Sequence, residues 1–309
     1  MYFSMIRRHM RKSFLCILML SLLAASAACS DDIYDPAKEG GNNGKDPEEN
    51  TEKPGETVTD VVTAPPAELT QWLDYKESPL DPFYKKYVDC DGLPVLSSDK
   101  VKDEALLQVC YIARHMLSFI PEAREEMIRC HFRIGVVAYN ENITDLPECK
   151  MMSVWWPETD WDARGRGYGA TLAIPVMSIG EENVIEIPGF TERYWDQSIM
   201  VHEFAHNVDF ALSRVDDKFK TALADAFANA SAEGLWKGSY SMTNSAEYFA
   251  EGAQAWFNAC SIVVPNKNGS GTFTLKDRLQ LQYYDTKLYE LCASVFPEEE
   301  LKGYHFDKQ

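Results

Sequence analysis

The sequence predicts an α+β fold that is mostly helical and contains a small mixed sheet. Three observations favour this class. Segments after residue 196 place apolar residues at helical spacing over several turns. Shorter segments between residues 131 and 187 alternate or run apolar, as strands do. With 309 residues, 45% of them hydrophobic, the chain is also long enough to bury a sizeable core.

The first segments of the folded part are expected to be helical. Residues 66–77 and 81–88 are rich in aromatic side chains and are interpreted as two short helices. Asp99 or Ser98 can cap a longer helix that runs to about Phe119. Pro121 suits the first turn of the next helix, where an N–H would have no partner within the helix.

Two further regions are expected to form the sheet. Residues 131–139 place apolar side chains at every second position, which predicts a strand. The apolar runs 174–179 and 183–187 flank Gly180-Glu181-Glu182 and are interpreted as two paired strands.

An aromatic and arginine-rich patch lies between these regions. Trp155, Trp156 and Trp161 precede the segment 163–169, which reads Ala-Arg-Gly-Arg-Gly-Tyr-Gly. Such a patch could bind a substrate. Tryptophans more often pack in a core, however, so packing is the favoured interpretation.

The rest of the chain is expected to be helical. Residues 196–213 and 216–230 are predicted to be amphipathic helices. Thr243 or Asn244 can cap a third helix. Residues 275–296 are predicted to close the fold as a single helix.

The amino-terminal segment 1–28 is interpreted as a secretion signal. Basic residues precede an apolar run at 14–23, and small residues follow as far as Cys29. These small residues resemble the lipobox of bacterial lipoproteins, although Ser26 stands where a leucine-like residue is usual. Ser30-Asp31-Asp32 resembles the acidic surface-export signal of lipoproteins of the Bacteroides group.

We therefore expect Cys29 to be acylated. The protein would then be an outer-membrane lipoprotein exposed at the cell surface, which contacts the membrane through its lipid anchor only. Cleavage without lipidation, leaving a secreted or periplasmic protein, is the alternative. Residues 29–66 are rich in glycine, proline and acids and are expected to form a disordered tether. The folded domain would span 67–309, with a helical and sheet part at about 67–195 and a helical part at about 196–309.

The chain is strongly acidic. Its net charge is −18, and because the first 28 residues carry four basic groups and no acid, the rest carries −22. Such a surface repels a phosphate backbone, so no nucleic-acid partner is expected. Beyond Cys16 and Cys29, six cysteines remain whose pairing the sequence leaves open. They are Cys90, Cys110, Cys130, Cys149, Cys260 and Cys292.

Residues 202–206, His-Glu-Phe-Ala-His, match the His-Glu-x-x-His pattern of zinc hydrolases. On a helix, His202 and His206 project from the same face and can bind one metal ion. Glu203 lies one step round the helix, where its carboxylate can act as general base on a metal-bound water. The alternative is a pair of histidines on an ordinary amphipathic helix.

Catalytic zinc usually takes three protein ligands. Glu247 and Glu251 lie one turn apart on the predicted helix after Asn244, among aromatic residues that indicate burial. A buried acid without a partner is costly, so Glu247 is predicted to be the third ligand rather than only part of a capping box. Glu251 is predicted to accept a hydrogen bond from a ligand histidine. Asp209 is expected either to serve the other histidine or to be a solvated surface acid.

These motifs together resemble a known family. Two segments of the chain are similar to the gluzincin zinc metallopeptidases, namely residues 202–206 and residues 240–251, which read Tyr-Ser-Met-Thr-Asn-Ser-Ala-Glu-Tyr-Phe-Ala-Glu. Within that family the resemblance is closest to the catalytic domain of anthrax lethal factor and covers about 60 residues. The resemblance implies a zincin-like fold and one Zn²⁺ bound by His202, His206 and Glu247. It also implies that Glu203 is the base and that Tyr240, seven residues before the third ligand, assists catalysis.

A broader resemblance covers most of the folded part. Segments 86–95, 180–183 and 247–257 are similar to a group of secreted microbial and fungal proteins that carry the same metal motif. Zinc peptidases of this layout use an edge strand above the cleft to align an extended peptide. That role is expected for the strands predicted within residues 176–187.

The function expected from these observations is an exported zinc metallopeptidase that hydrolyses peptide bonds in a peptide or protein substrate. Two alternatives stay open. One is a surface lipoprotein of a nutrient-capture system, with uptake partners at the cell surface, a metal site and little catalysis. The other is a zinc hydrolase of a non-protein amide substrate. The sequence leaves cleavage specificity and oligomeric state open.

Overall fold

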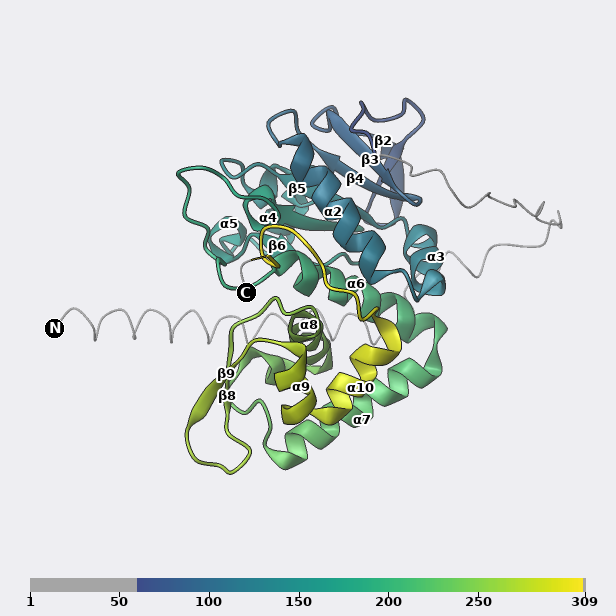
Figure 1. Ribbon diagram of the computed structural model, residues 1–309. Helices are drawn as coiled ribbons and strands as arrows, with labels where there is room; N and C mark the ends of the chain where they lie inside the picture. Colours follow the sequence, from purple (N-terminus) through teal and green to yellow (C-terminus); the bar gives the residue numbers. More distant parts are fainter. Residues whose placement is uncertain (1–59, 308–309) are drawn as a thin grey trace. The chain divides into compact units, whose positions relative to one another are not determined.

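A computed structural model describes residues 60–307 (Figure 1). The expected signal segment 1–28, the acylation residue Cys29 and the tether as far as residue 59 lie outside the described residues. Within the described part the fold is α+β, with nine α-helices and a small mixed sheet, as predicted. No helix between residues 60 and 307 is long and apolar enough to cross a membrane.

Five strands form the main sheet. They are β3 (Lys86–Cys90), β4 (Leu93–Ser97), β5 (Arg133–Val137), β6 (Gly167–Tyr168) and β7 (Val176–Gly180). Their order across the sheet is β3-β4-β5-β7-β6. The three inner strands are parallel, whereas β3 and β6 run antiparallel to their neighbours at the two edges. Every residue of β5 and β7 is buried, which is typical of strands covered on both faces.

Some helices pack against this sheet, and others lie in the lower half of Figure 1. α2 (Asp103–Met116) packs against β3 and β4, and α3 (Pro121–Arg129) begins at its proline as predicted. α6 (Ile199–Val215) lies between the sheet and the remaining helices, and one hydrophobic core runs through both sides (Figure 1). Those remaining helices are α7 (Asp217–Glu233), α8 (Ser245–Trp256), α9 (Arg278–Tyr284) and α10 (Thr286–Val295).

The two helices predicted at residues 66–77 and 81–88 are wrong. β1 (Thr70–Leu73) and β2 (Lys76–Pro79) form an antiparallel hairpin in the first region. The second region is irregular until β3 begins at Lys86.

Turn geometry and a distant partner explain this difference. Asp74 and Tyr75 both have positive φ, 50° and 61°, as the two central residues of a tight hairpin turn require. The ring of Trp72 on β1 stacks on His131, with ring centroids 3.7 Å apart. The aromatic residues of this segment therefore serve strand packing against a residue far along the chain, which periodicity alone does not reveal.

The strand predicted at residues 183–187 is also wrong. After β7 the chain enters a 3₁₀ turn at Glu181–Asn183. The buried Glu181 carboxylate accepts hydrogen bonds from the backbone N–H groups of Lys102, at 2.9 Å, and Tyr139, at 3.0 Å. These bonds hold the turn, so the apolar run after it packs as irregular chain.

The single helix predicted at residues 275–296 is wrong as well. The hairpin of β8 (Ile262–Pro265) and β9 (Thr272–Leu275) ends where that helix was expected to begin. Two helices follow, α9 and α10, because Asp285 interrupts them. Its carboxylate accepts a hydrogen bond from the Leu288 N–H at 3.2 Å and caps α10.

The tryptophan patch packs together. Trp155 ends α4 (Lys150–Trp155), and Trp161 begins α5 (Trp161–Arg164). Trp156 contacts both rings edge to face, with centroids 5.7 and 5.8 Å apart. Trp161 is buried, in agreement with the favoured packing interpretation.

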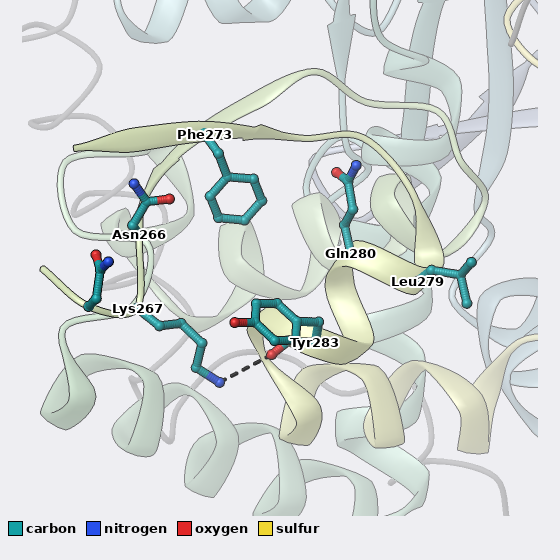
Figure 2. A pocket seen from close by; sticks show the side chains of 7 residues that line it. Asn266, Lys267, Phe273, Leu279, Gln280 and Tyr283 are labelled. Carbon is teal, nitrogen blue, oxygen red and sulfur yellow. Dashed lines mark hydrogen bonds between the residues drawn. The ribbon is translucent and has the colours of Figure 1, made fainter. Parts of the chain in front are cut away.

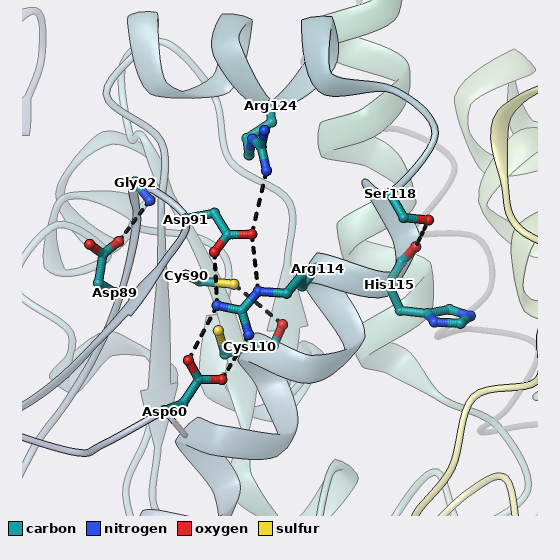
Figure 3. Close-up of polar contacts among 10 residues, drawn as sticks. All are labelled: Asp60, Asp89, Cys90, Asp91, Gly92, Cys110, Arg114, His115, Ser118 and Arg124. Carbon is teal, nitrogen blue, oxygen red and sulfur yellow. Dashed lines mark hydrogen bonds and ion pairs between the residues drawn. The ribbon is translucent and has the colours of Figure 1, made fainter. Parts of the chain in front are cut away.

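The folded part extends further toward the amino terminus than residue 67. Thr63 and Tyr87 exchange two backbone N–H···O bonds of 3.0 and 2.8 Å. Asp60 accepts hydrogen bonds from both terminal nitrogens of Arg114, at 2.7 and 3.2 Å (Figure 3). Residues 60–66, expected to belong to the tether, therefore pack on the domain.

The guanidinium of Arg114 also donates to Asp91, which Arg124 reaches at 3.4 Å (Figure 3). We call Asp60, Asp91, Arg114 and Arg124 the Arg114 cluster. Beside it, the Cys90 thiol donates to the Cys110 carbonyl oxygen at 3.3 Å. Within the described part, all six cysteines of the domain are buried free thiols.

Candidate metal centre

α6 presents the His-Glu-x-x-His motif. Ser198 caps the helix, because its hydroxyl accepts a hydrogen bond from the Val201 N–H at 3.3 Å. The rings of His202 and His206 lie on the same face, with centroids 4.9 Å apart. The expected apolar stripe of the helix is buried. Its residues are Val201, Phe204, Ala205, Val208 and Leu212.

Asn183 determines where α6 begins. Its Oδ1 accepts a hydrogen bond from the Met200 N–H at 3.0 Å. Its Nδ2 donates to the Gln197 carbonyl oxygen at 3.2 Å and to the Glu192 carboxylate. His305 Nε2 lies 3.2 Å from Glu192 Oε2 and 3.2 Å from Asn183 Nδ2. One buried amide therefore joins the turn after β7, the loop before α6, the motif helix and the carboxyl-terminal segment.

α8 brings the third acid to the motif helix. Asn244 caps it as predicted, because its side chain accepts a hydrogen bond from the Glu247 N–H at 2.8 Å. Every residue from Glu247 to Trp256 is buried. The Glu247 carboxylate is thus held inside the fold on a helix that packs against α6.

Three ligand atoms converge on one point. The distance from His202 Nε2 to Glu247 Oε2 is 3.1 Å, from His206 Nε2 to Glu247 Oε2 3.3 Å, and between the two Nε2 atoms 3.2 Å. Ligands at 2.0–2.2 Å around a tetrahedral metal ion lie about 3.3–3.5 Å apart. The three side chains therefore fit a single small cation, and we call them the metal cluster.

Hydrogen bonds alone cannot satisfy this cluster. Each Nε2 carries at most one hydrogen, so the two histidines offer two hydrogens for three close contacts. Burial disfavours the charged forms, but Glu247 outweighs this and raises the pKa of His202 to about 9. Burial likewise raises the pKa of Glu247, and the two imidazoles outweigh it and lower that pKa well below its usual range. A cation would satisfy all three donor atoms at once.

Gln254 orients the first histidine. Its Oε1 lies 3.1 Å from His202 Nδ1, and its Nε2 donates to the Ser198 carbonyl oxygen at 2.9 Å. The amide oxygen is therefore free to accept the Nδ1 hydrogen, which leaves Nε2 directed at the metal cluster. Gln254 was not predicted from the sequence, and the role that it fills was predicted for Glu251. The Glu251 carboxylate instead accepts a hydrogen bond from the Ser241 hydroxyl.

Asp209 lies one turn after His206 on α6. Its carboxylate accepts a hydrogen bond from the Ser213 hydroxyl at 2.8 Å. Burial raises the pKa of Asp209, and the nearby charge of His206 opposes that rise. The expected support of His206 by Asp209 stays a prediction.

Glu203 does not join the three ligand atoms and lies on the side of α6 nearest the edge strand β6. A Cβ atom on Gly167 would lie 2.9 Å from Glu203 Cγ, and one on Gly169 would lie 3.2 Å from His206 Cβ. Only glycine therefore lets β6 lie this close to the motif helix. Burial raises the pKa of Glu203, while the charges of His202 and His206 oppose the rise.

β6, and not the predicted strands, is the edge beside the motif. β7 lies inside the sheet, between β5 and β6, so it has no free edge. β6 is only two residues long, which is too short to give a periodic signal in the sequence.

Tyr240 lies at the metal cluster. Its hydroxyl donates to Glu247 Oε1 at 2.9 Å, and its ring stacks against His202 with centroids 6.3 Å apart. Burial and the Glu247 charge raise the pKa of Tyr240, so the hydroxyl stays protonated and available as a donor.

A separate cavity of about 560 Å³ lies between the β8–β9 loop and α9 (Figure 2). Phe273 and the exposed Tyr283 line it, and Lys267 Nζ donates to the Tyr283 carbonyl oxygen at 3.2 Å. It shares no residue with the metal cluster.

The interpretation of the metal cluster depends on this geometry. The donors are two imidazoles and one carboxylate, a set suited to a divalent transition metal. No protein-family model, curated protein or solved structure matches this chain.

Proposed function

We propose that this protein is an exported zinc metallopeptidase of zincin-like fold, with zinc bound by His202, His206 and Glu247. The observation that carries the proposal is the convergence of two Nε2 atoms and one carboxylate oxygen within 3.1–3.3 Å of one another. The His-Glu-x-x-His helix places Glu203 beside them. An antiparallel edge strand against the same helix supports the zincin-like fold and offers β6 as the place where an extended peptide would align.

The remaining residues supply the chemistry around the metal. When bound, zinc lowers the pKa of a coordinated water from near 16 to about 7 and polarises a carbonyl. Glu203 accepts the proton from the attacking water on its carboxylate and delivers it to the leaving amine. Tyr240 donates a hydrogen bond to the oxyanion that develops on the carbonyl oxygen. Gln254 keeps His202 in the tautomer that presents Nε2.

We propose further that the protein reaches the cell surface as a lipoprotein acylated on Cys29. The composition of the segment around this residue supports that attachment. Membrane contact is through the lipid alone in this proposal.

Substitution of the base tests the function directly. Glu203→Gln should leave zinc content at about one ion per chain, because Glu203 is not a ligand, and should lower peptide cleavage at least about a thousandfold. Elemental analysis and cleavage of a mixed peptide library measure the two quantities. Glu233→Gln, the same change on an exposed position of α7, is the matched control and should alter neither.

Three outcomes would redirect the proposal. Full cleavage by Glu203→Gln would show that another group is the base. Binding of peptides without cleavage, with zinc present and Glu203 intact, would favour a surface-binding protein of a nutrient-capture system. Hydrolysis of amides that are not peptides would favour the other alternative.

A further inference from the structure

Arg164 lies against two aromatic rings next to the edge strand β6. It ends α5, just before β6. Its guanidinium carbon lies 5.2 Å from the centre of the Trp161 ring and 5.5 Å from that of Tyr168. Arg193 donates to the carbonyl oxygens of Ala163 and Arg164, at 2.9 and 3.2 Å, and so fixes the backbone of this turn.

Two nearby arginines differ in whether an acid neutralises them. Arg166 donates to both carboxylate oxygens of Glu182, at 2.6 and 3.0 Å, and to two backbone carbonyls. Arg164 instead lies over the aromatic rings of Trp161 and Tyr168. Within residues 60–307, no carboxylate lies within ion-pair distance of Arg164. The Arg164 guanidinium therefore keeps hydrogen-bond donors available for a ligand.

The charge of Arg164 acts on the reacting groups. Burial raises the pKa of Glu203, Tyr168 and Tyr240, and in each case the positive charge of Arg164 opposes the rise. The same guanidinium lies over the ring of Tyr168, which belongs to β6. β6, which follows Arg164 directly, lies against Glu203 at Gly167. Arg164 thus stands at the end of the strand along which a peptide would align.

We propose that Arg164 binds a carboxylate of the substrate, which makes peptides with an acid group next to the scissile bond the preferred substrate class. The inference rests on the proposed peptidase function. A guanidinium pre-ordered by two aromatic rings loses little freedom on binding and can donate two parallel hydrogen bonds to a carboxylate. The carboxylate could be an Asp or Glu side chain or the free carboxyl terminus of the peptide.

Matched peptides separate these sources. Each Asp or Glu peptide is paired with its Asn or Gln counterpart, and each free carboxyl terminus with its amide. We expect the zinc-loaded protein to cleave the carboxylate member with a kcat/KM about tenfold higher, mostly through a lower KM. Preference within the Asp/Asn and Glu/Gln pairs assigns the side chain, and preference within the terminal pairs assigns the terminus.

Variants of Arg164 test the residue itself. Arg164→Met keeps the stem that packs on the rings but removes the charge, so the tenfold preference for the carboxylate member should vanish while zinc content stays at about one ion per chain. Arg164→Lys should restore part of the preference. Arg124→Gln, which removes an equal charge from α3, is the control and should keep the full preference for the carboxylate member. A preference retained in Arg164→Met, or absent from the wild type, overturns the inference.

A binding measurement keeps this test separate from turnover. The same peptide pairs, fluorescently labelled, are titrated into zinc-loaded Glu203→Gln with and without Arg164→Met. If the wild type cleaves nothing, the peptidase function fails, yet tighter binding of the carboxylate members that depends on Arg164 still supports the carboxylate site. Equal binding of both members overturns the inference whether or not peptides are cleaved.

Discussion

The metal cluster and the Arg114 cluster both gather charged side chains from distant segments, but they differ in how charge is balanced. In the Arg114 cluster, every carboxylate faces a guanidinium (Figure 3). The Arg114 and Asp91 side chains are 37% and 38% exposed, so water shares in their solvation. This cluster is complete as it stands, and its contribution to stability is expected to be small.

The metal cluster is the opposite case. Its residues are at most one-fifth exposed, and its three ligand atoms point at one another rather than at separate partners. A convergent buried set of this kind fits a cation, whereas the opposite charges of the Arg114 cluster already balance one another. Convergence and burial of donor atoms, and not the number of charged residues, distinguish a candidate ligand site from a structural cluster.

Removal of Glu247 should have the largest effect of any substitution on zinc binding and on cleavage. Glu247→Ala deletes one of three ligands, so zinc content at equal free zinc should fall from about one ion per chain to near none, and cleavage should fall at least about a thousandfold. Added zinc should no longer raise the unfolding temperature. Asp60→Ala, which removes a carboxylate from the Arg114 cluster, should retain full zinc. If elemental analysis found about one zinc per chain in Glu247→Ala, Glu247 would not be a ligand and the metal cluster would not differ from the Arg114 cluster in the way described.

Substitution of Tyr240 should lower kcat without changing zinc binding. Tyr240→Phe loses a hydrogen-bond donor near the developing oxyanion, so kcat should fall about 10- to 100-fold while zinc is retained. Steady-state kinetics with parallel metal analysis check this. Tyr283→Phe, an exposed tyrosine at the separate cavity, should leave kcat unchanged. An unaltered kcat in Tyr240→Phe would assign that residue to the support of Glu247 alone.

Substitution of Gln254 should weaken zinc affinity more than it lowers kcat. Gln254→Leu removes the acceptor for His202 Nδ1, and zinc affinity measured by competition with a chelator should weaken about 10- to 100-fold. Glu251→Gln keeps a side chain that can accept from Ser241, and its effect should be smaller. If Glu251→Gln weakened zinc more than Gln254→Leu, the roles of the two residues would be reversed.

The smallest effect is expected in the Arg114 cluster. The hydrogen bond from Arg114 lowers the pKa of Asp91. A carboxyl with a lowered folded pKa stabilises the fold above its unfolded pKa, about 3.9, and loses that contribution as pH falls through the folded value. Arg114→Ala should therefore cost less than about 1 kcal/mol at pH 7, and the difference should narrow below pH 4. Urea unfolding at pH 7 and pH 3 measures it, and a constant difference would contradict the assignment.

Local rules predicted the helix that carries the two histidines and the start of α8. His202 and His206 follow from the spacing of a helix, and the cap by Asn244 follows from the preference of that residue for helix starts. Both depend on residues a few positions apart. The convergence of Glu247 on the histidines was expected from the family resemblance and the cost of a buried acid.

Other features depend on contacts between distant residues and were missed. Glu251 and Gln254 lie one turn apart on the same face of α8, so spacing cannot tell which one meets His202. The hairpin at residues 70–79 forms where a helix was expected, because strand pairing and the Trp72–His131 contact outweigh local preference. The chain likewise breaks between α9 and α10 because the buried Asp285 carboxylate caps α10.

The junction at Asn183 also has a consequence for motion. A single amide bonds the first turn of α6, the preceding loop and the neighbourhood of His305, so the opening of any one of these segments breaks a bond of the same side chain. Their backbone amides are therefore expected to exchange hydrogen with solvent as one cooperative unit. Opening of the first turn of α6 then depends on Asn183 and His305, which lie more than a hundred positions apart in the sequence. Neither residue belongs to the metal cluster.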